Sequence, residues 1–235
     1  VPVHDSPVWV RAFFLHPKTF GSAPVFLLTT NLNENDEQSR AISYRLYDST
    51  ISTRIAQSII LGIGGAMLID KLWLNIDIYH MNEGHSLPLN FYLHNKFKSM
   101  EEVKKRVVFT THTPEAAGNE EHRLDLLSEM SFFNGTPVDE VKEILDIDGS
   151  SLNYTLAALK FAKKANGVSR LHGEVARQMW RGNPGICEIT SITNAQNKKY
   201  WKDDKLEKAL AGDDDNAIVE RKKEMKRELF KLVGN

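Results

Sequence analysis

His112 is the side chain of this sequence that is best placed to do chemistry, because it follows a short run of branched apolar residues. The segment Val107–Thr111 has the composition of a buried parallel strand, and Thr113 and Glu115 follow in a polar turn. Open α/β sheets bind their ligands at the carboxyl ends of their strands. An imidazole, hydroxyls and a carboxylate therefore converge where a ligand is expected, but the pattern identifies no partner for nucleophilic catalysis.

A second polar cluster follows another predicted strand, Ile76–Asn82. Asn82, Glu83 and His85 surround a glycine, Gly84, that would let the backbone turn sharply. These side chains could hydrogen-bond sugar hydroxyls or hold a metal ion. Because no third residue has the spacing of zinc ligands, we expect hydroxyl binding and no metal site. Capping of the helix that follows explains this cluster equally well when it is taken alone.

Three further segments have a chemical and a structural interpretation. Asn166–His172 places a polar turn before a predicted helix, and Ile192–Ala195 lies at the end of a predicted strand. Taken singly, both segments are typical of folding signals rather than ligand contacts. Gly62–Gly65 is similar to a phosphate-binding loop. Such a loop joins a strand to a helix, whereas these glycines lie inside a helical pattern, so we expect close helix packing instead.

The elements that must position these residues alternate between strands and helices in the second half of the chain. The predicted strands are Ile76–Asn82, Arg106–Thr111, Asn166–Arg170 and Cys187–Thr193. Five predicted helices have two defined ends: 50–72, 122–130, 137–145, 151–165 and 171–180. Another follows the strand Ile76–Asn82 and ends near 98, and the last begins at a cap within Asp213–Asp215 and ends near 233. This alternation predicts the α/β class, with a doubly wound, mostly parallel Rossmann-like sheet.

The remaining elements divide the chain into three expected regions. Val8–Phe14 and Val25–Thr30 predict an amino-terminal β-hairpin, so residues 1–48 form a hairpin and an acidic loop. Residues 49–200 form the α/β core, and residues 201–235 form carboxyl-terminal helices. The last helix carries an apolar stripe of Ile218, Met225, Leu229 and Leu232 beneath a basic face.

Composition limits the classes of function. With 235 residues, of which 41% are hydrophobic and 26% charged, the chain can bury a sizeable core. A net charge of -1 gives no electrostatic reason to expect binding to nucleic acid or to an anionic membrane. The single cysteine, Cys187, excludes an intrachain disulfide framework and predicts a cytoplasmic location. No continuous apolar run approaches the ~20 residues that cross a bilayer, and the start of the chain lacks the pattern of a signal peptide.

Taken together and in this order, the segments resemble the α-glucan phosphorylases that act on glycogen, starch or maltodextrin, most closely their bacterial and archaeal members. The matching motifs are Trp9–Ala12, Arg40–Tyr47, Thr53–Gly65, His80–His85, Phe109–Pro114 and Asn166–Gly173. The resemblance implies a retaining glycosyltransferase of the GT-B type, built from two Rossmann domains. Such an enzyme uses phosphate to cleave an α-1,4-glucan and releases glucose 1-phosphate, and its cofactor is pyridoxal phosphate.

The resemblance also implies roles for individual residues. His112 would be the catalytic residue that contacts the glucosyl unit at the cleavage site, where it orients and stabilises without acting as a nucleophile. Thr113 would belong to the same substrate loop. Asn82, Glu83 and His85 would line the sugar pocket and bind hydroxyls, and the segment from Asn166 would be mainly architectural.

The sequence departs from the family pattern in three places. The glycine-rich phosphate loop would lie before Val1, and the domain with the lysine that binds pyridoxal phosphate would follow Asn235, so we expect no cofactor-binding residue in this chain. Thr193–Asn197 replaces the family's Thr-Asn-Gly-Val-His, with Ala195 at the glycine position. The chain is therefore expected to be part of a phosphorylase amino-terminal domain.

Such a part would be a fragment or subunit that is inactive when isolated. It would bind α-1,4-glucan and phosphate and work with a complementary chain that carries the pyridoxal phosphate domain, and a homo-oligomer is compatible with it. The first alternative is a non-catalytic remnant that keeps glucan binding or an interaction role. A second is another transferase with two Rossmann domains that uses a nucleotide sugar.

Overall fold

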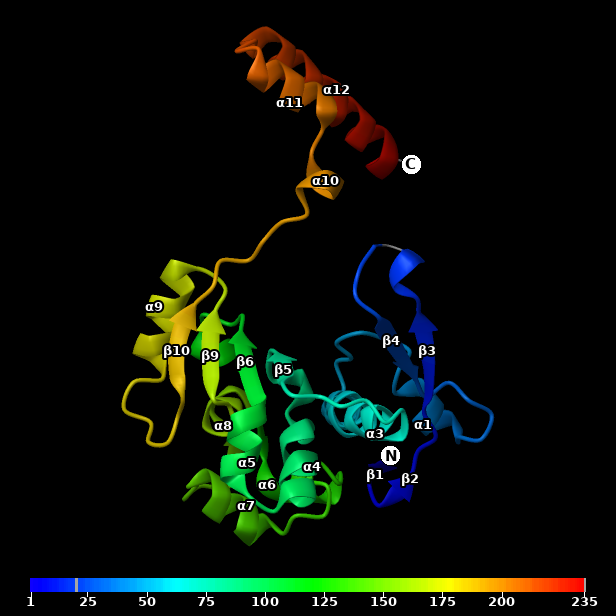
Figure 1. Cartoon of the computed structure of the whole chain (residues 1–235). Helices are drawn as coiled ribbons and strands as arrows, with labels where there is room; N and C mark the ends of the chain where they lie inside the picture. Colours follow the sequence, from blue (N-terminus) through cyan, green and yellow to red (C-terminus); the bar gives the residue numbers. More distant parts are fainter. Residues whose placement is uncertain (20, 235) are drawn as a thin grey trace. The chain divides into compact units, whose positions relative to one another are not determined.

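The computed structural model describes residues 1–19 and 21–234, which form two compact units (Figure 1). The first unit spans Val1–Thr193, and the second begins at Asn194.

A four-stranded parallel sheet organises the first unit, with the strand order β10-β9-β6-β5. The strands are β5 (Tyr79–Asn82), β6 (Val107–Thr111), β9 (Lys164–Gly167) and β10 (Glu188–Ser191). The register aligns Thr110 of β6 with Asn82 of β5 and with Asn166 of β9. The predicted α/β class with its four parallel strands is therefore confirmed, although β9 begins two residues earlier than predicted.

One face of this sheet is buried and the other is polar. Phe109, Ala165 and Ile189 are at most 5% exposed, whereas the alternate residues Lys164 and Glu188 are exposed. The strands follow one another across the sheet in chain order, and right-handed crossovers that all move in one direction place their helices on the same face. Buried and exposed residues thus alternate along these strands, whereas parallel strands that are covered on both faces have continuous apolar runs.

Helices and one short pair of strands connect the parallel strands. The helices are α4 (Pro88–Phe97), α5 (Met100–Arg106), α6 (Leu124–Glu129), α7 (Val138–Leu145), α8 (Tyr154–Phe161) and α9 (Arg170–Met179). The sequence interpretation missed α5, which buries only Val103. It also extended α8 too far, because β8 (Ser151–Asn153) pairs with β7 (Glu121–Arg123) and the Asn153 side chain caps the helix by accepting from Leu156 N.

Packed aromatic rings hold this helical layer together. The ring of Phe91 on α4 lies 5.0 Å from that of Phe133 and 5.3 Å from that of Phe161, in edge-to-face contacts. All three side chains are at most 1% exposed. Aromatic pairs of this geometry add about 0.5–1.5 kcal/mol each to the free energy of their burial, so the contact of Phe91 with Phe161 stabilises the packing of α4 against α8.

The amino-terminal region contains the predicted hairpin. Strands β3 (Arg11–Leu15) and β4 (Val25–Thr29) pair antiparallel, and the short β1 (Pro2–Val3) pairs with β2 (Ser6–Pro7). A short helix, α1 (Glu37–Ala41), begins at Asp36, whose side chain accepts from Ser39 N.

The long predicted helix is a continuous run of α2 (Ile51–Ile59), a π-helical turn (Ile60–Gly64) and α3 (Gly65–Lys71). Among the described residues this run is long and apolar enough to cross a membrane by length and composition alone, but half of its apolar window is buried inside the protein. A helix in the core of a folded domain meets the same criterion of length and composition. A Cβ atom added to Gly62 would lie 2.7 Å from Leu89 N and 2.9 Å from Ser86 O, so this glycine serves close packing.

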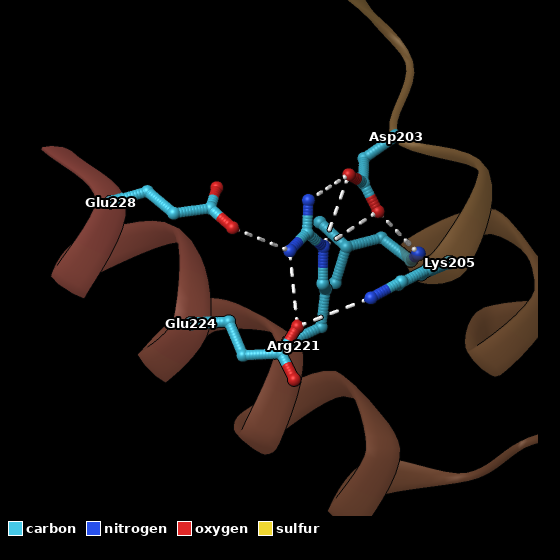
Figure 2. Close-up of polar contacts among 6 residues, drawn as sticks. Asp203, Lys205, Arg221, Glu224 and Glu228 are labelled. Carbon is cyan, nitrogen blue, oxygen red and sulfur yellow. Dashed lines mark hydrogen bonds and ion pairs between the residues drawn. The ribbon is translucent and has the colours of Figure 1, made fainter.

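The second unit consists of α10 (Lys198–Trp201), α11 (Asp204–Ala211) and α12 (Asp215–Val233). As expected from the sequence, an acidic residue caps the last helix, since the Asp214 side chain accepts from Ala217 N. Arg221 of α12 joins the two longer helices by pairing with Asp203, at 2.7 Å between Nη2 and Oδ2 (Figure 2). This pairing holds the pKa of Asp203 at about 2.

Candidate functional site

A cavity of about 740 Å³ lies at the carboxyl ends of β5 and β6. The five residues that were assigned roles in the site line it, namely Asn82, Glu83, His85, His112 and Thr113, whereas Glu115 does not. They come from two loops that are separated along the chain and that the pairing of β5 with β6 brings together. Convergence of polar groups at the strand ends of an α/β sheet is the usual arrangement of a ligand site in this class.

Glu83 connects the two loops. Its Oε2 atom accepts a hydrogen bond from His112 N at 2.7 Å and another from Thr113 Oγ1 at 3.1 Å. The Glu83 backbone N–H donates to Thr110 O at 2.9 Å, which extends the pairing of the two strands. The loop that carries the imidazole is thus fastened to the preceding strand end by a carboxylate.

The turn after β5 differs from the one that the sequence predicted. The expectation that Gly84 supplies the sharp turn is wrong, because the positive φ of 63° belongs to Glu83. A Cβ atom at position 84 would instead lie 3.0 Å from Tyr154 Cβ. Glycine is needed here for a close approach to α8, and the strained backbone is on the glutamate.

His85 lies half-buried beside the rim of the cavity. Burial lowers its pKa below the ordinary value, although the Glu83 carboxylate opposes that shift. The ring of Tyr47 meets the His85 ring edge to face, with centroids 5.7 Å apart. A neutral imidazole donates with one nitrogen and accepts with the other, which suits it to contact hydroxyl groups.

Arg54, Glu120 and Tyr154 also line the cavity, and the sequence did not indicate them. Arg54 of α2 forms an ion pair with Glu120, and His122 Nε2 lies 3.5 Å from Glu120 Oε2. The Tyr154 hydroxyl is buried without a hydrogen-bond partner, and burial raises the pKa of this tyrosine. Arg54 lies within the quoted motif Thr53–Gly65, but no local pattern predicts that it meets a residue 66 positions further along the chain.

The other polar segments lie outside this cavity. Ser169 caps α9 by accepting from His172 N at 3.1 Å, and Val168 N donates to His172 Nδ1 at 3.2 Å. Asn166 Oδ1 accepts from Thr110 Oγ1, which also contacts His80 Nε2 at 2.7 Å on the polar face of the sheet. These residues start a helix or link strands, as folding signals do.

The cavity offers no fit to a cofactor phosphate. Among the described residues that line it there is no lysine, and its one arginine, Arg54, is already paired with Glu120. An incoming phosphate would also face the carboxylate of Glu83. Within the described part of the chain, no group of three or more His, Cys, Asp or Glu side chains could hold a metal ion.

Comparisons with known proteins place this geometry in context. No protein-family model matches the chain. It is 42% identical over 235 residues to an uncharacterized protein of Methanocaldococcus jannaschii, in an alignment that covers 100% of this chain and 44% of that protein. It is 33% identical over 225 residues to the maltodextrin phosphorylase of Thermococcus litoralis, covering 89% of this chain and 27% of the relative.

A second named phosphorylase and a solved structure are also similar to this chain. The glycogen phosphorylase of Aquifex aeolicus is 32% identical over 224 residues, covering 86% of this chain and 31% of the relative. The catalytic domain of starch synthase IV from Arabidopsis thaliana, bound to ADP and acarbose, has a similar fold, with a TM-score of 0.55 and 13% identity over 76% of this chain and 36% of that one. This likeness confirms a GT-B type fold.

The chain spans less than half the length of each of these curated relatives. The two named phosphorylases align with most of the chain at 32–33% identity. The protein is therefore homologous to a part of the glycogen and maltodextrin phosphorylases, between a quarter and a third of their length.

Proposed function

We propose that this chain supplies the sugar-binding half of an α-glucan phosphorylase active site. The observation that carries the proposal is the convergence of two loops on one cavity, joined through the Glu83 carboxylate to His112 and Thr113. A volume of about 740 Å³ falls within the range of small-molecule sites, ~300–1,000 Å³. Homology to glycogen and maltodextrin phosphorylases supports an α-1,4-glucan as the ligand class.

In this proposal the polar side chains divide the work of recognition. His112 is exposed at the mouth of the cavity, where its imidazole can bind a hydroxyl and its backbone carbonyl can face the positive charge of an oxocarbenium-like transition state. Asn82, His85 and Thr113 hydrogen-bond other hydroxyls of the sugar. Glu83 can accept from a hydroxyl through Oε1, since the two hydrogen bonds found for its carboxylate go to Oε2.

The phosphate chemistry belongs, in this proposal, to residues outside this chain. The carboxylates of Glu83 and Glu120 disfavour binding of a phosphate in the cavity, and Arg54 is already paired with Glu120. Pyridoxal phosphate and orthophosphate would therefore be held by a complementary chain, and phosphorolysis to glucose 1-phosphate would appear only on assembly. We place the protein in the cytoplasm, because its single cysteine, Cys187, is unpaired and fits a reducing compartment.

Assembly with such a partner gives the test. The chain is co-expressed with a pyridoxal phosphate domain encoded nearby in the genome, and glucose 1-phosphate is measured with maltodextrin and phosphate. Release that requires both chains, and that falls sharply in the pair carrying His112→Ala, supports the proposal. No release from an assembled pair with His112 intact overturns it.

A non-catalytic role in glucan binding is the second candidate. It is favoured by the lining of the cavity, which holds groups that can bind hydroxyls but, among the described residues, no lysine and no unpaired arginine that could hold a phosphate. Maltodextrin binding by the isolated chain, together with an assembled pair that never releases glucose 1-phosphate, would favour this candidate over phosphorolysis.

A further inference from the structure

Glu83 adopts a backbone conformation that non-glycine residues rarely occupy. Its φ is 63° and its ψ is 178°, in a region that is open essentially to glycine alone. Strain of this kind persists only where the surroundings determine it, and it is concentrated at binding and active sites. The residue next to it is a glycine that could take up the turn instead, so the position of the glutamate side chain calls for an explanation.

Contacts on both sides fix this conformation. The residue before it, Asn82, is in register with Thr110 in the parallel sheet, and Glu83 N donates to Thr110 O at 2.9 Å. The residue after it, Gly84, is so close to α8 that a Cβ atom would lie 3.0 Å from Tyr154 Cβ. With the chain held before and after, the turn has to be made at residue 83.

The Glu83 carboxylate then acts on the neighbouring loop. One oxygen, Oε2, accepts from the backbone N–H of His112 and from the hydroxyl of Thr113, at 2.7 and 3.1 Å. Hydrogen bonds to a charged acceptor are among the stronger ones in proteins. The Thr113 side chain is also closely packed, since a Cβ atom on Gly118 would lie 2.8 Å from its methyl carbon.

We propose that Glu83 is a positioning residue, whose strained backbone aims its carboxylate at the His112 loop and presets that loop for the sugar. The inference rests on the proposed function of His112 in sugar binding. It assigns Glu83 a task in the free protein, before any ligand arrives. Hydroxyl recognition through Oε1 is compatible with this task.

Two variants test the inference because they retain different parts of the arrangement at residue 83. Glu83→Gly relieves the backbone strain and removes the carboxylate, whereas Glu83→Gln keeps the strain and one acceptor oxygen. The measurements are amide hydrogen exchange at His112 by NMR, the melting temperature, and the dissociation constant for maltodextrin.

In Glu83→Gly we expect exchange at the His112 amide to accelerate about tenfold or more, as loss of a hydrogen bond to a charged group implies. Its melting temperature should stay level or rise, while maltodextrin binding weakens. In Glu83→Gln, exchange should be intermediate and binding partly retained. A purely structural role would lower the melting temperature and would leave the exchange at His112 in step with that of its neighbours.

Lys98→Gly is the matched control. Lys98 also has a positive φ, 53°, at the end of α4, and it does not line the cavity. This variant should leave exchange at His112 and maltodextrin binding unchanged.

Exchange at His112 that is the same in Glu83→Gly and in the unaltered chain would overturn the positioning role. Failure of the unaltered chain to bind maltodextrin would overturn the proposed function instead. The exchange comparison needs no ligand, so the two failures are distinguishable.

Discussion

Adding one methyl group at Gly62 is a sensitive test of how the long helix packs against α4. In Gly62→Ala the new Cβ atom would meet Leu89 N at 2.7 Å and Ser86 O at 2.9 Å. Both are backbone atoms, Leu89 N in the first turn of α4 and Ser86 O in the 3-10 turn (Gly84–Ser86) just before it, so neither can move aside as a flexible side chain would. Overpacking of this kind costs about 1–3 kcal/mol, and more in rigid surroundings.

The helix propensity of alanine opposes this cost. Because both close contacts are with backbone, the overpacking cost should lie in the upper part of that range, about 2–3 kcal/mol. Replacing a helical glycine by alanine gains about 0.8–1.0 kcal/mol, so the net destabilisation by Gly62→Ala should be about 1–2 kcal/mol. For a chain of this size that corresponds to a fall in melting temperature of roughly 2–8 °C.

Gly65→Ala is the control, because it adds the same methyl group three residues along the same helix. No heavy atom lies within 4 Å of the Cβ position there. It should therefore show only the propensity gain, a stabilisation of up to about 1 kcal/mol.

Thermal and urea unfolding followed by circular dichroism measure both variants. Equal effects of Gly62→Ala and Gly65→Ala would refute the packing argument. A Gly62→Ala variant that keeps its stability but loses binding of inorganic phosphate would favour the phosphate loop instead.

Further expected outcomes concern the cavity and the second unit. His112→Ala should weaken maltodextrin binding about tenfold, near the value of one good hydrogen bond, and should change unfolding free energy by less than about 0.5 kcal/mol because the residue is exposed. Burial lowers the pKa values of His85 and His122, because it disfavours the charged imidazolium. Their contribution to the free energy of unfolding is therefore complete above their ordinary pKa, about pH 6.5, and is lost as the pH falls through the lowered values. The urea concentration at the unfolding midpoint should accordingly be lower at pH 5 than at pH 8. Asp203→Asn keeps a helix cap but removes the charge paired with Arg221, so it should lower the thermal stability of the α11–α12 helices at pH 7. The pKa of Asp203 is about 2 in the folded chain and ~3.9 when unfolded. The difference from the unaltered chain should therefore shrink as the pH falls below about 4 and should vanish only below about 2.

The α/β alternation could be predicted because its signals are local. Val107–Thr111 and the spaced isoleucines of the long helix carry periodicities that depend only on their neighbours. Ile55, Ile59 and Ile63 of that spacing are all fully buried. The same locality explains the error at β9, because alanines before it continue the helical pattern of α8 and hide the strand start at Lys164.

The composition of the cavity could be predicted only in part. Residues that follow strands could be found, since the end of a strand is visible in the sequence. The ion pair of Arg54 with Glu120 could not, because it joins α2 to a distant loop. The positive φ of Glu83 was also hidden, since the packing of Gly84 against Tyr154 decides which residue makes the turn.

The most direct test of the sugar-binding claim is a titration of the ¹⁵N-labelled chain with maltodextrin, followed by NMR. We expect saturable shifts in the backbone amides of Asn82, His85, His112 and Thr113, which line the cavity at the ends of β5 and β6. Saturable shifts confined to another surface, such as the separate pocket lined by Lys160, would contradict the account, and so would no shift at millimolar maltodextrin.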